Sequence, residues 1–302
     1  MGGEAISMKL LLTGCNGQVG FELQRSLAPL AEVIAIDIAD CDLSNEVALR
    51  AFIQKVKPDG IINPAAYTAV DKAESDSELA KKINVDAPRI MGEEASKLGA
   101  FVFHYSTDYV FEGVGEGFYK ESDATNPQNV YGKTKCDGEQ ALLLACSHSL
   151  IMRTSWVVGA HGGNFAKTML KLASEREALS VVADQYGAPT SAALLADITA
   201  QLVGRIKLYG HSAFQFGLYH VVASGVTSWH EYAQFVIAEA IKAGKPMKVL
   251  PEMVKPISTE DYPVPAKRPA NSRLDTALFQ STFNLRLPDW KLGITHVLQQ
   301  IL

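Results

Sequence analysis

Short runs of apolar residues alternate along this chain with longer segments in which apolar residues recur every three or four positions. The short runs predict strands, and the longer spacing predicts helices. The predicted strands are residues 8–12, 32–37, 60–63, 100–106, 150–154 and 217–221. The predicted helices are residues 18–27, 47–56, 75–98, 131–145, 165–176 and 193–203, with one more near the C-terminus. Such alternation is typical of a parallel sheet with helices on both faces, which right-handed crossovers make doubly wound. The predicted fold class is therefore α/β, with a Rossmann-type sheet.

The regular alternation of strand and helix patterns ends after Thr154. Glycines cluster there, and a proline-rich stretch follows later in the chain. Most of this part is expected to form a smaller C-terminal lobe beside the sheet. We expect the sheet domain to span residues 8–155, with residues 191–224 returning to it. The lobe would then consist of residues 156–190 and 225–302. Residues 1–7 are expected to be a disordered extension.

Composition narrows the classes of protein that this chain can be. Its 302 residues are 47% apolar and 20% charged, which is enough to bury a core and does not indicate disorder. The net charge is −5 and no basic stretch occurs, so a nucleic-acid partner is not indicated. No apolar run reaches the ~18 residues of a membrane helix, and residues 1–7 lack the apolar core of a signal peptide. The four cysteines lack metal-ligand spacing, so we expect unpaired thiols in a cytoplasmic protein.

Three glycines follow the first predicted strand at a spacing that suits a phosphate-binding turn. Gly14 permits a tight turn, Gly17 lets a pyrophosphate approach the backbone, and Gly20 lets the next helix lie close to its strand. The positive end of that helix then faces the phosphates. The spacing G-x-x-G-x-x-G differs from the usual G-x-G-x-x-G fingerprint, and the same glycines also suit ordinary turns.

Asp37 closes the second predicted strand, where a carboxylate can accept hydrogen bonds from both ribose hydroxyls of an adenosine. The same charge repels a 2′-phosphate, so electrostatics alone favours NADH over NADPH. An acid that stabilises the turn is the alternative. Asp42 and Leu43 follow, one polar and one apolar group that can border the adenine. Small residues after the third strand, at 64–66, let a cofactor pass close over the sheet.

Tyr131 and Lys135 lie four residues apart on a predicted helix and therefore on one face of it. A phenol with a pKa near ~10 is a poor acid–base catalyst at neutral pH, and a neighbouring ammonium lowers that pKa. Thr107 ends a strand at the edge where ligands bind in doubly wound folds, so its hydroxyl can bond both the phenol and a carbonyl that is being reduced. An exposed helical pair and a capping threonine are the alternatives. Asp108 is either a substrate contact or an acid that stabilises a turn.

Together these motifs resemble the extended short-chain dehydrogenase/reductases, and most closely the reductases that act last in dTDP-L-rhamnose synthesis. The likeness covers nearly the whole chain from Met8, in blocks of specific order and spacing. The blocks are residues 14–20, 65–74, 106–111, 153–157, 164–169 and 184–190. The resemblance implies an oxidoreductase that uses NADPH, often with NADH too, to reduce the C4 ketone of dTDP-4-dehydro-L-rhamnose. Its product would supply a cell-surface polysaccharide such as O-antigen.

The resemblance also implies roles for individual residues, with the sheet domain binding NAD(P) and the lobe binding the sugar nucleotide. The implied cofactor-binding residues are Gly14, Gly17, Gln18, Val19, Gly20, Asp37, Asp42, Leu43, Ala66, Tyr67, Thr68, Tyr131 and Lys135. Tyr131 would donate the proton, Lys135 would lower the pKa of Tyr131, and Thr107 would tune the pair. The implied substrate-binding residues are Thr107, Asp108 and Trp156. The large apolar plane of an indole suits the face of a deoxysugar or a base.

One property of some family members is not expected here. They bridge a dimer through Mg²⁺ with acids, but this chain has residues 192–194 (Ala-Ala-Leu) in one of those regions and Trp290 followed by Lys291 in the other. Because a hard cation requires oxygen ligands, we expect no metal. The expected partner is a small-molecule nucleotide sugar, with no nucleic acid and no membrane, and the chain is expected to be a monomer or a homodimer.

Several alternatives stay open. A nucleotide-sugar epimerase or dehydratase of the same fold would keep its NAD bound, and the absence of stoichiometric cofactor consumption would reveal it. A non-catalytic, NADP-binding regulatory subunit of methionine adenosyltransferase also resembles this family and acts by binding a partner. Trp156 suits a core position as well as a ligand contact. Arg268 and Arg273 either meet the diphosphate or form surface ion pairs.

Overall fold

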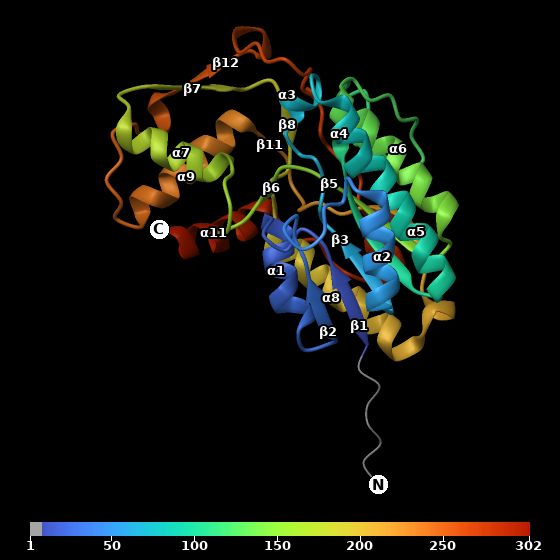
Figure 1. The fold of residues 1–302 in the computed structure, drawn as a ribbon. Coiled ribbons are helices and arrows are strands. Elements are labelled where there is room, and N and C mark those ends of the chain that lie inside the picture. Colours follow the sequence, from blue (N-terminus) through green and yellow to red (C-terminus); the bar gives the residue numbers. More distant parts are fainter. Residues whose placement is uncertain (1–7) are drawn as a thin grey trace.

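The computed structural model describes residues 8–302, so the extension expected at residues 1–7 lies outside the described residues. At the centre of the molecule is a sheet of six parallel strands (Figure 1). In spatial order these strands are β2 (Glu32–Ala35), β1 (Lys9–Leu12), β3 (Gly60–Asn63), β4 (Phe101–Thr107), β5 (Ser149–Thr154) and β10 (Gly217–His220). Each coincides with a predicted strand, and the predicted doubly wound α/β class is confirmed.

The order of the strands reverses between β1 and β3. β1 pairs with β2 on one side and with β3 on the other, so that Leu11 lies opposite both Ile34 and Ile61. In an open parallel sheet, the loops that follow the strands diverge at such a point and leave a crevice above the carboxyl ends. The glycine turn follows β1, and it therefore opens into this crevice.

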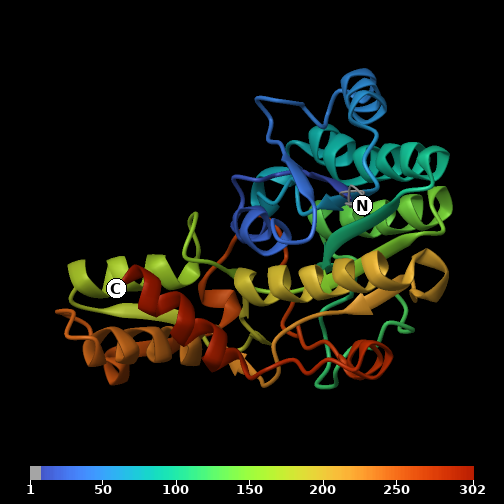
Figure 2. The ribbon, with the colours of Figure 1, turned by 90° about the horizontal axis from the view of Figure 1, so that it is seen from below.

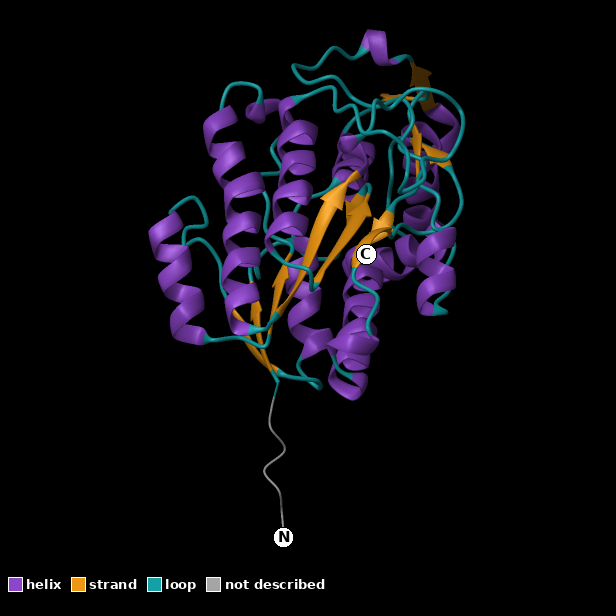
Figure 3. Ribbon diagram, turned by 90° about the vertical axis from the view of Figure 1, so that its right-hand side faces the viewer, coloured by secondary structure: helices purple, strands orange, loops and turns teal. Residues whose placement is uncertain are grey.

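Helices cover both faces of the sheet (Figures 2 and 3). One face carries α1 (Gln18–Leu27) and α8 (Ala192–Tyr209). The other face carries α2 (Glu46–Val56), α5 (Ala87–Leu98) and α6 (Val130–Ala145). Successive side chains of a strand point to opposite faces, so Leu10 and Leu12 join the first core while Leu11 joins the second. Each fully buried leucine contributes roughly 1.5–3 kcal/mol, which explains why the strands are almost purely apolar.

The long helix predicted for residues 75–98 is wrong in one respect, because it is interrupted. The segment consists of α4 (Ser77–Lys81), a π-helical turn η1 (Lys82–Asp86) and α5, and the short helix α3 (Val70–Ala73) precedes it. Pro88 has no N–H to donate to the carbonyl of Asn84, four residues earlier, so the regular ladder cannot continue there. In the wider π-helical turn, the side-chain amide of Asn84 faces the backbone of Tyr67. The amide oxygen accepts a hydrogen bond from the Tyr67 N–H, and the amide nitrogen donates one to the Tyr67 carbonyl oxygen.

A second, smaller core lies beside the sheet. It is built from α7 (Phe165–Glu175), α9 (Trp229–Lys242) and α11 (Trp290–Ile301), packed on the parallel pair β7 (Leu179–Val182) and β12 (Val254–Ile257). Sequence reasoning did not find β12 within the proline-rich stretch. It also missed α10 (Ala277–Phe283), whose Phe279 and Phe283 return to the core of the sheet.

Short elements complete the description. They are β6 (Val157–Val158), β8 (Tyr186–Gly187), β9 (Thr190–Ser191), β11 (Thr227–Ser228), and the 3₁₀ turns η2 (Asp108–Val110), η3 (His211–Ala213), η4 (Pro251–Met253) and η5 (Thr259–Asp261). Within residues 8–302, no helix is long and apolar enough to cross a membrane. The four cysteines are free thiols, as expected.

Candidate active site

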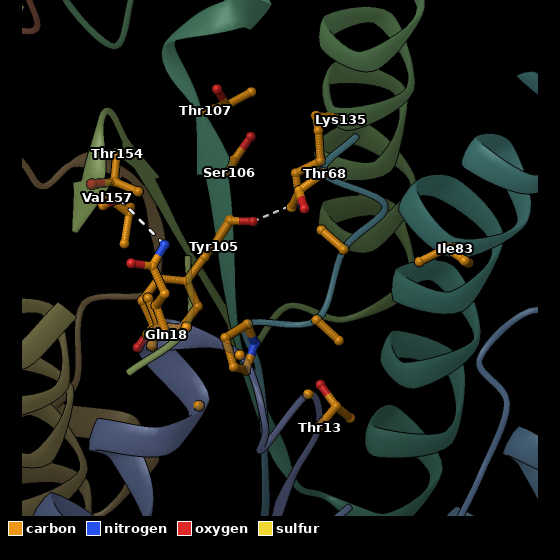
Figure 4. A pocket seen from close by; sticks show the side chains of 18 of the residues that line it. Thr13, Gln18, Thr68, Ile83, Tyr105, Ser106, Thr107, Lys135, Thr154 and Val157 are labelled. Atoms are coloured by element: carbon orange, nitrogen blue, oxygen red, sulfur yellow. Dashed lines mark hydrogen bonds between the residues drawn. The ribbon is translucent and has the colours of Figure 1, made fainter. Parts of the chain in front are cut away.

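A cavity of about 770 Å³ lies over the carboxyl ends of β1, β3, β4 and β5 (Figure 4). Its walls bring together nearly all of the site residues that the sequence suggested. The predicted residues that line it are Gly14, Gly17, Gln18, Val19, Gly20, Asp37, Asp42, Leu43, Ala66, Thr68, Thr107, Asp108, Tyr131, Lys135 and Trp156. Ligand cavities in proteins commonly measure roughly 300–1,000 Å³, so this one is large enough for a sizeable ligand.

The glycine turn forms the floor of the cavity at the start of α1. Gly14 has a left-handed backbone, with φ +57°. A Cβ atom on Gly20 would lie 2.0 Å from the backbone oxygen of Gly14, so the helix can approach the turn only if that position is glycine. Gly17 caps α1 and no side chain occupies its N-terminus. The first N–H groups of the helix therefore suit an anionic group in the cavity.

Asp37 stands just beyond β2 on the cavity wall, in a fixed orientation. One carboxylate oxygen accepts a hydrogen bond from the N–H of Asn16 at 2.9 Å, and the other accepts from the N–H of Ile38 at 2.8 Å. The charge is thus held at the rim of the glycine turn. Asp42 lines the same end of the cavity, and hydrogen bonds from Ser44 keep the pKa of that carboxyl below its usual value.

The side chain of Gln18 bonds to the protein itself, and its expected contact with a pyrophosphate stays a prediction. Its side-chain nitrogen donates to the backbone oxygen of Val157 at 3.4 Å, drawn as a dashed line in Figure 4. Its side-chain oxygen accepts from the N–H of Gly159 at 2.8 Å and from the amide of Asn164 at 3.0 Å. The side chain therefore fastens the start of α1 to the loop that leaves the sheet, and only the backbone of Gln18 is left for an anionic ligand.

Tyr67 was expected at the nicotinamide side of the cavity, but it is not part of the cavity wall. The phenol donates to Asp76 at 3.1 Å instead. Its backbone is held by Asn84, as described above, so the turn after β3 is fixed while the ring points elsewhere. The neighbouring Ala66 and Thr68 do line the cavity.

Tyr131 enters the cavity from the first turn of α6. Asn129 caps this helix by accepting from the N–H of Gly132 at 2.7 Å. A Cβ on Gly132 would lie 2.2 Å from the backbone oxygen of Tyr109, so glycine lets the helix approach the end of β4. Burial raises the pKa of Tyr131 to about 12, and a hydrogen bond with the hydroxyl of Thr107 opposes this rise. The phenol is therefore protonated at neutral pH.

Lys135 lines the same cavity, one turn along α6, and is 1% exposed. Its side-chain nitrogen donates to the backbone oxygen of Tyr105 at 2.6 Å and lies 3.0 Å from Nε2 of His104. Burial lowers the pKa of Lys135 to about 8, against the effect of Glu139. The Lys135 amine is bound to β4, and burial dominates the pKa of Tyr131. The expected lowering of the phenol pKa by Lys135 stays a prediction.

Several buried polar atoms around the cavity have no partner among residues 8–302. They are one carboxylate oxygen of Asp108 and the hydroxyls of Ser106 and Thr154. The other oxygen of Asp108 accepts from the Thr107 hydroxyl at 3.1 Å. An unsatisfied buried polar group costs about 1–3 kcal/mol, so these atoms are suited to a polar ligand. Sequence reasoning did not single out Ser106 or Thr154, although they lie next to the end of β4 and at the end of β5, at the edge where ligands bind.

Aromatic side chains close the cavity on the side of the smaller lobe. Trp156 follows β5 with a left-handed backbone, φ +49°, which is rare for a residue other than glycine. Its indole stacks on Trp229, the first residue of α9, which also lines the cavity. Trp229 was not predicted as a site residue, and no local motif marks it in the sequence.

The two arginines considered for a diphosphate lie outside the cavity wall. Arg268 forms an ion pair with Asp71, with 2.6 Å between nitrogen and oxygen. Arg273 donates to the side chain of Asn271 at 2.8 Å and lies over the ring of Tyr186. Arg268 therefore forms the ion pair that was the alternative to a diphosphate contact, and Arg273 is bonded to Asn271.

Comparison with known proteins adds independent information. Residues 8–302 match the family model described as the RmlD substrate binding domain. The dTDP-4-dehydrorhamnose reductase of Salmonella typhimurium is 51% identical over 298 residues, which cover 97% of this chain and 98% of that protein. The dTDP-4-dehydrorhamnose reductase of Bacillus anthracis, solved in complex with NADP, is 34% identical with a TM-score of 0.89 and covers 98% of this chain and 100% of its own. UDP-glucose 4-epimerase of Thermus thermophilus, solved with NAD, shares the fold at 19% identity and a TM-score of 0.77, covering 97% of this chain and 99% of that chain.

Proposed function

This chain belongs to the family of dTDP-4-dehydrorhamnose reductases, and we propose that it uses NADPH or NADH to reduce the C4 ketone of dTDP-4-dehydro-L-rhamnose to dTDP-L-rhamnose. The observation that carries the proposal is that Tyr131, Thr107 and Lys135 share one cavity with the glycine turn. A proton donor thus lies at the switch point where doubly wound folds bind dinucleotides. Residues 8–155 with 191–224 would bind the cofactor, and residues 156–190 with 225–302 would bind the substrate.

The cavity fits a dinucleotide in three ways. The turn at Gly14 and Gly17 leaves room at the uncapped N-terminus of α1, which suits a pyrophosphate. Asp37 stands where a ribose would be held, and Asp42 and Leu43 border the adenine end. Ala66, Thr68 and Lys135 line the opposite end, near Tyr131. When bound there, a reduced nicotinamide dinucleotide supplies the hydride.

Tyr131 would supply the proton. Because its pKa is raised to about 12, the phenol carries its proton at neutral pH and can give it to an oxygen that becomes basic as the ketone is reduced. The Thr107 hydroxyl donates to Asp108 at 3.1 Å and accepts from the N–H of Tyr109 at 3.2 Å, which holds it in the cavity that the phenol also lines. Lys135 would hold a ribose hydroxyl from the helix that carries the acid.

The substrate would lie between Asp108 and Trp156. The free carboxylate oxygen of Asp108 can accept from a sugar hydroxyl, and the indole of Trp156 offers an apolar face to the sugar or the base. Binding of the remote thymidine diphosphate would position the ketone for the reaction. We propose a small-molecule nucleotide sugar as the partner of this chain, acting as a monomer or homodimer.

The test follows loss of reduced nicotinamide absorbance with dTDP-4-dehydro-L-rhamnose, with NADPH and NADH in turn. One cofactor should be consumed for each sugar reduced. Tyr131→Phe should lower kcat by about 10²–10⁴-fold, while the exposed Tyr209→Phe should keep wild-type activity. Turnover without net cofactor consumption would instead indicate an epimerase or dehydratase. A fully active Tyr131→Phe variant would exclude the assigned acid.

A further inference from the structure

Four buried side chains, the first and last of which line the cavity, form one hydrogen-bonded chain that ends at Lys135. The hydroxyl of Thr13 donates to the Asn63 side-chain oxygen at 2.6 Å. The Asn63 nitrogen lies 3.0 Å from Nδ1 of His104, and Nε2 of His104 lies 3.0 Å from the Lys135 nitrogen. None of the four residues is more than 1% exposed.

The fold itself aligns this chain. Thr13 follows β1, Asn63 ends β3 and His104 lies in β4, three strands that are neighbours in the sheet. Asn63 and His104 are directly opposite each other in the parallel register. The hydrogen bonds therefore run across the sheet, from the residue before the Gly14 turn to Lys135 on α6.

An imidazole that keeps one proton imposes a direction on such a chain. In the structure the Asn63 nitrogen faces Nδ1, which must then be an acceptor, so the imidazole proton lies on Nε2 and points to a neutral Lys135 amine. An ammonium at Lys135 instead needs Nε2 as an acceptor. The imidazole proton then lies on Nδ1, and the Asn63 amide must turn over to present its oxygen.

The surroundings keep His104 in its neutral form. Burial holds the pKa of His104 well below its ordinary value, and the positive charge of Lys135 acts in the same direction. Glu139, on the same helix, raises the pKa of Lys135 and is itself paired with Arg153 of β5 at 2.7 Å. Tyr131, one turn earlier on this helix, lines the same cavity as Lys135. His104 is the titratable side chain that directly contacts the Lys135 nitrogen across the sheet.

We infer that His104 is a positioning residue for Lys135, and that its tautomer follows the charge of that amine: proton on Nδ1 opposite an ammonium, proton on Nε2 opposite a neutral amine. Asn63 and Thr13 complete the relay and extend it to the glycine turn. This inference rests on the proposed function for its catalytic consequence, but not for the tautomer change itself.

Nitrogen NMR of the ¹⁵N-histidine-labelled full-length protein tests the tautomer directly. His104→Gln identifies the His104 signals, and the exposed His296→Gln is the matched control that should leave them unchanged. As the pH rises through about 8, where burial places the pKa of Lys135, the His104 proton should move from Nδ1 to Nε2. Lys135→Met should abolish this change. One fixed tautomer across the titration of Lys135 would overturn the inference.

Kinetics test the positioning role. His104→Leu removes the contact with the amine and should lower kcat by about 10²-fold, because a small misplacement of a catalytic group is costly. An ammonium that loses its acceptor is less stable, so the alkaline limb of the pH–rate profile should move to lower pH. His104→Gln, which keeps a side-chain hydrogen-bonding group, should retain most of the activity.

A second variant guards against misfolding of His104→Leu. Thr13→Val keeps the shape of the side chain at the end of the hydrogen-bonded chain opposite Lys135 and removes only its hydroxyl. The fold should therefore persist, while the pH at which the His104 tautomer changes should shift. An unshifted change, or an active His104→Leu with a wild-type pH profile, would refute the relay. Failure of the proposed reaction is recognised separately, because the wild-type protein would then show the tautomer change without reducing the ketone.

Discussion

The indole rings of Trp156 and Trp229 stack face to face, with 3.7 Å between centroids and 17° between planes, where the sheet meets the smaller lobe. The backbone of Trp156 is left-handed there, at a cost of about 1–3 kcal/mol. An aromatic pair contributes about 0.5–1.5 kcal/mol beyond its buried area. The stack therefore offsets much of the strain that places the Trp156 indole on the cavity wall.

We predict that Trp229→Leu weakens substrate binding rather than the chemical step. Without its stacking partner the Trp156 ring loses its fixed position, so KM for the sugar nucleotide should rise about tenfold, equivalent to roughly 1.4 kcal/mol, with kcat little changed. The far-ultraviolet circular dichroism couplet of the indole pair should disappear. Trp229→Phe keeps an aromatic face, so it should lose the couplet but keep the KM. An unchanged KM in Trp229→Leu would contradict this role.

Two glycine substitutions in helices should have opposite effects. Gly20→Ala places a Cβ 2.0 Å from the Gly14 oxygen, so α1 must move away from the turn. Both the melting temperature and the affinity for NADPH, measured by fluorescence titration, should fall. Gly204→Ala in α8 meets no atom closer than 4.0 Å and should stabilise the protein by about 0.5–1 kcal/mol, with unchanged cofactor affinity. Equal effects of the two changes would show that the close contact at Gly20 is unimportant.

Asp37→Asn should shift cofactor choice toward NADPH. The carboxylate is held at the cavity rim by two N–H groups, so its charge faces any 2′-phosphate bound there. Removing one such charge is worth roughly 1 kcal/mol at a distance of about 4 Å in water. The ratio of kcat/KM for NADPH to that for NADH should therefore increase about five- to tenfold. A ratio that stays constant, with both cofactors still used, would place the 2′-phosphate away from Asp37.

Asp108 should make stability depend on pH. Burial raises the pKa of this carboxyl to about 6, so the folded state prefers the protonated form. That stabilisation is complete below the unfolded pKa near 3.8 and is lost as the pH rises through about 6. Asp108→Asn keeps a neutral group at this position. Its free energy of unfolding should exceed that of the wild type by up to roughly 3 kcal/mol near neutral pH, and the two should converge near about pH 4.

Urea unfolding of wild type and Asp108→Asn across this pH range measures the difference. Glu112→Gln, an exposed acid on the loop that follows η2, is the control and should run parallel to the wild type. A constant difference between wild type and Asp108→Asn at all pH values would show that the Asp108 carboxyl does not titrate in this range.

Much of the fold follows from local pattern. The apolar run Leu10–Leu12 predicts a strand buried on both faces, and the alternation of strands with helices predicts the layered sheet. The interruption at η1 does not follow from periodicity, because it depends on the missing N–H of Pro88 and on the partner that Asn84 finds in Tyr67. β12 was hidden by Pro256, which ordinarily argues against a strand.

The residues of the candidate site likewise include some that local sequence predicts and some that it does not. A spacing of four residues is enough to predict that Tyr131 and Lys135 face one cavity, where the structure brings them together. Trp229 reaches that cavity only through the packing of the smaller lobe, and the phenol of Tyr67 donates a hydrogen bond to Asp76 instead of lining the cavity. Contacts between residues far apart in the chain decide these cases, and such contacts leave no mark on local sequence.

The smaller core is assembled from two stretches of chain, one before α8 and one after β10, and α10 of the second stretch packs back onto the sheet through Phe279 and Phe283. Removal of either stretch would disrupt the smaller core, and removal of the second would disrupt the core of the sheet as well. Limited proteolysis between α8 and β10 should therefore yield fragments that stay associated, and thermal denaturation should proceed as a single cooperative event. The lobe surface that we propose to bind the sugar nucleotide therefore keeps its shape only while the sheet stays folded.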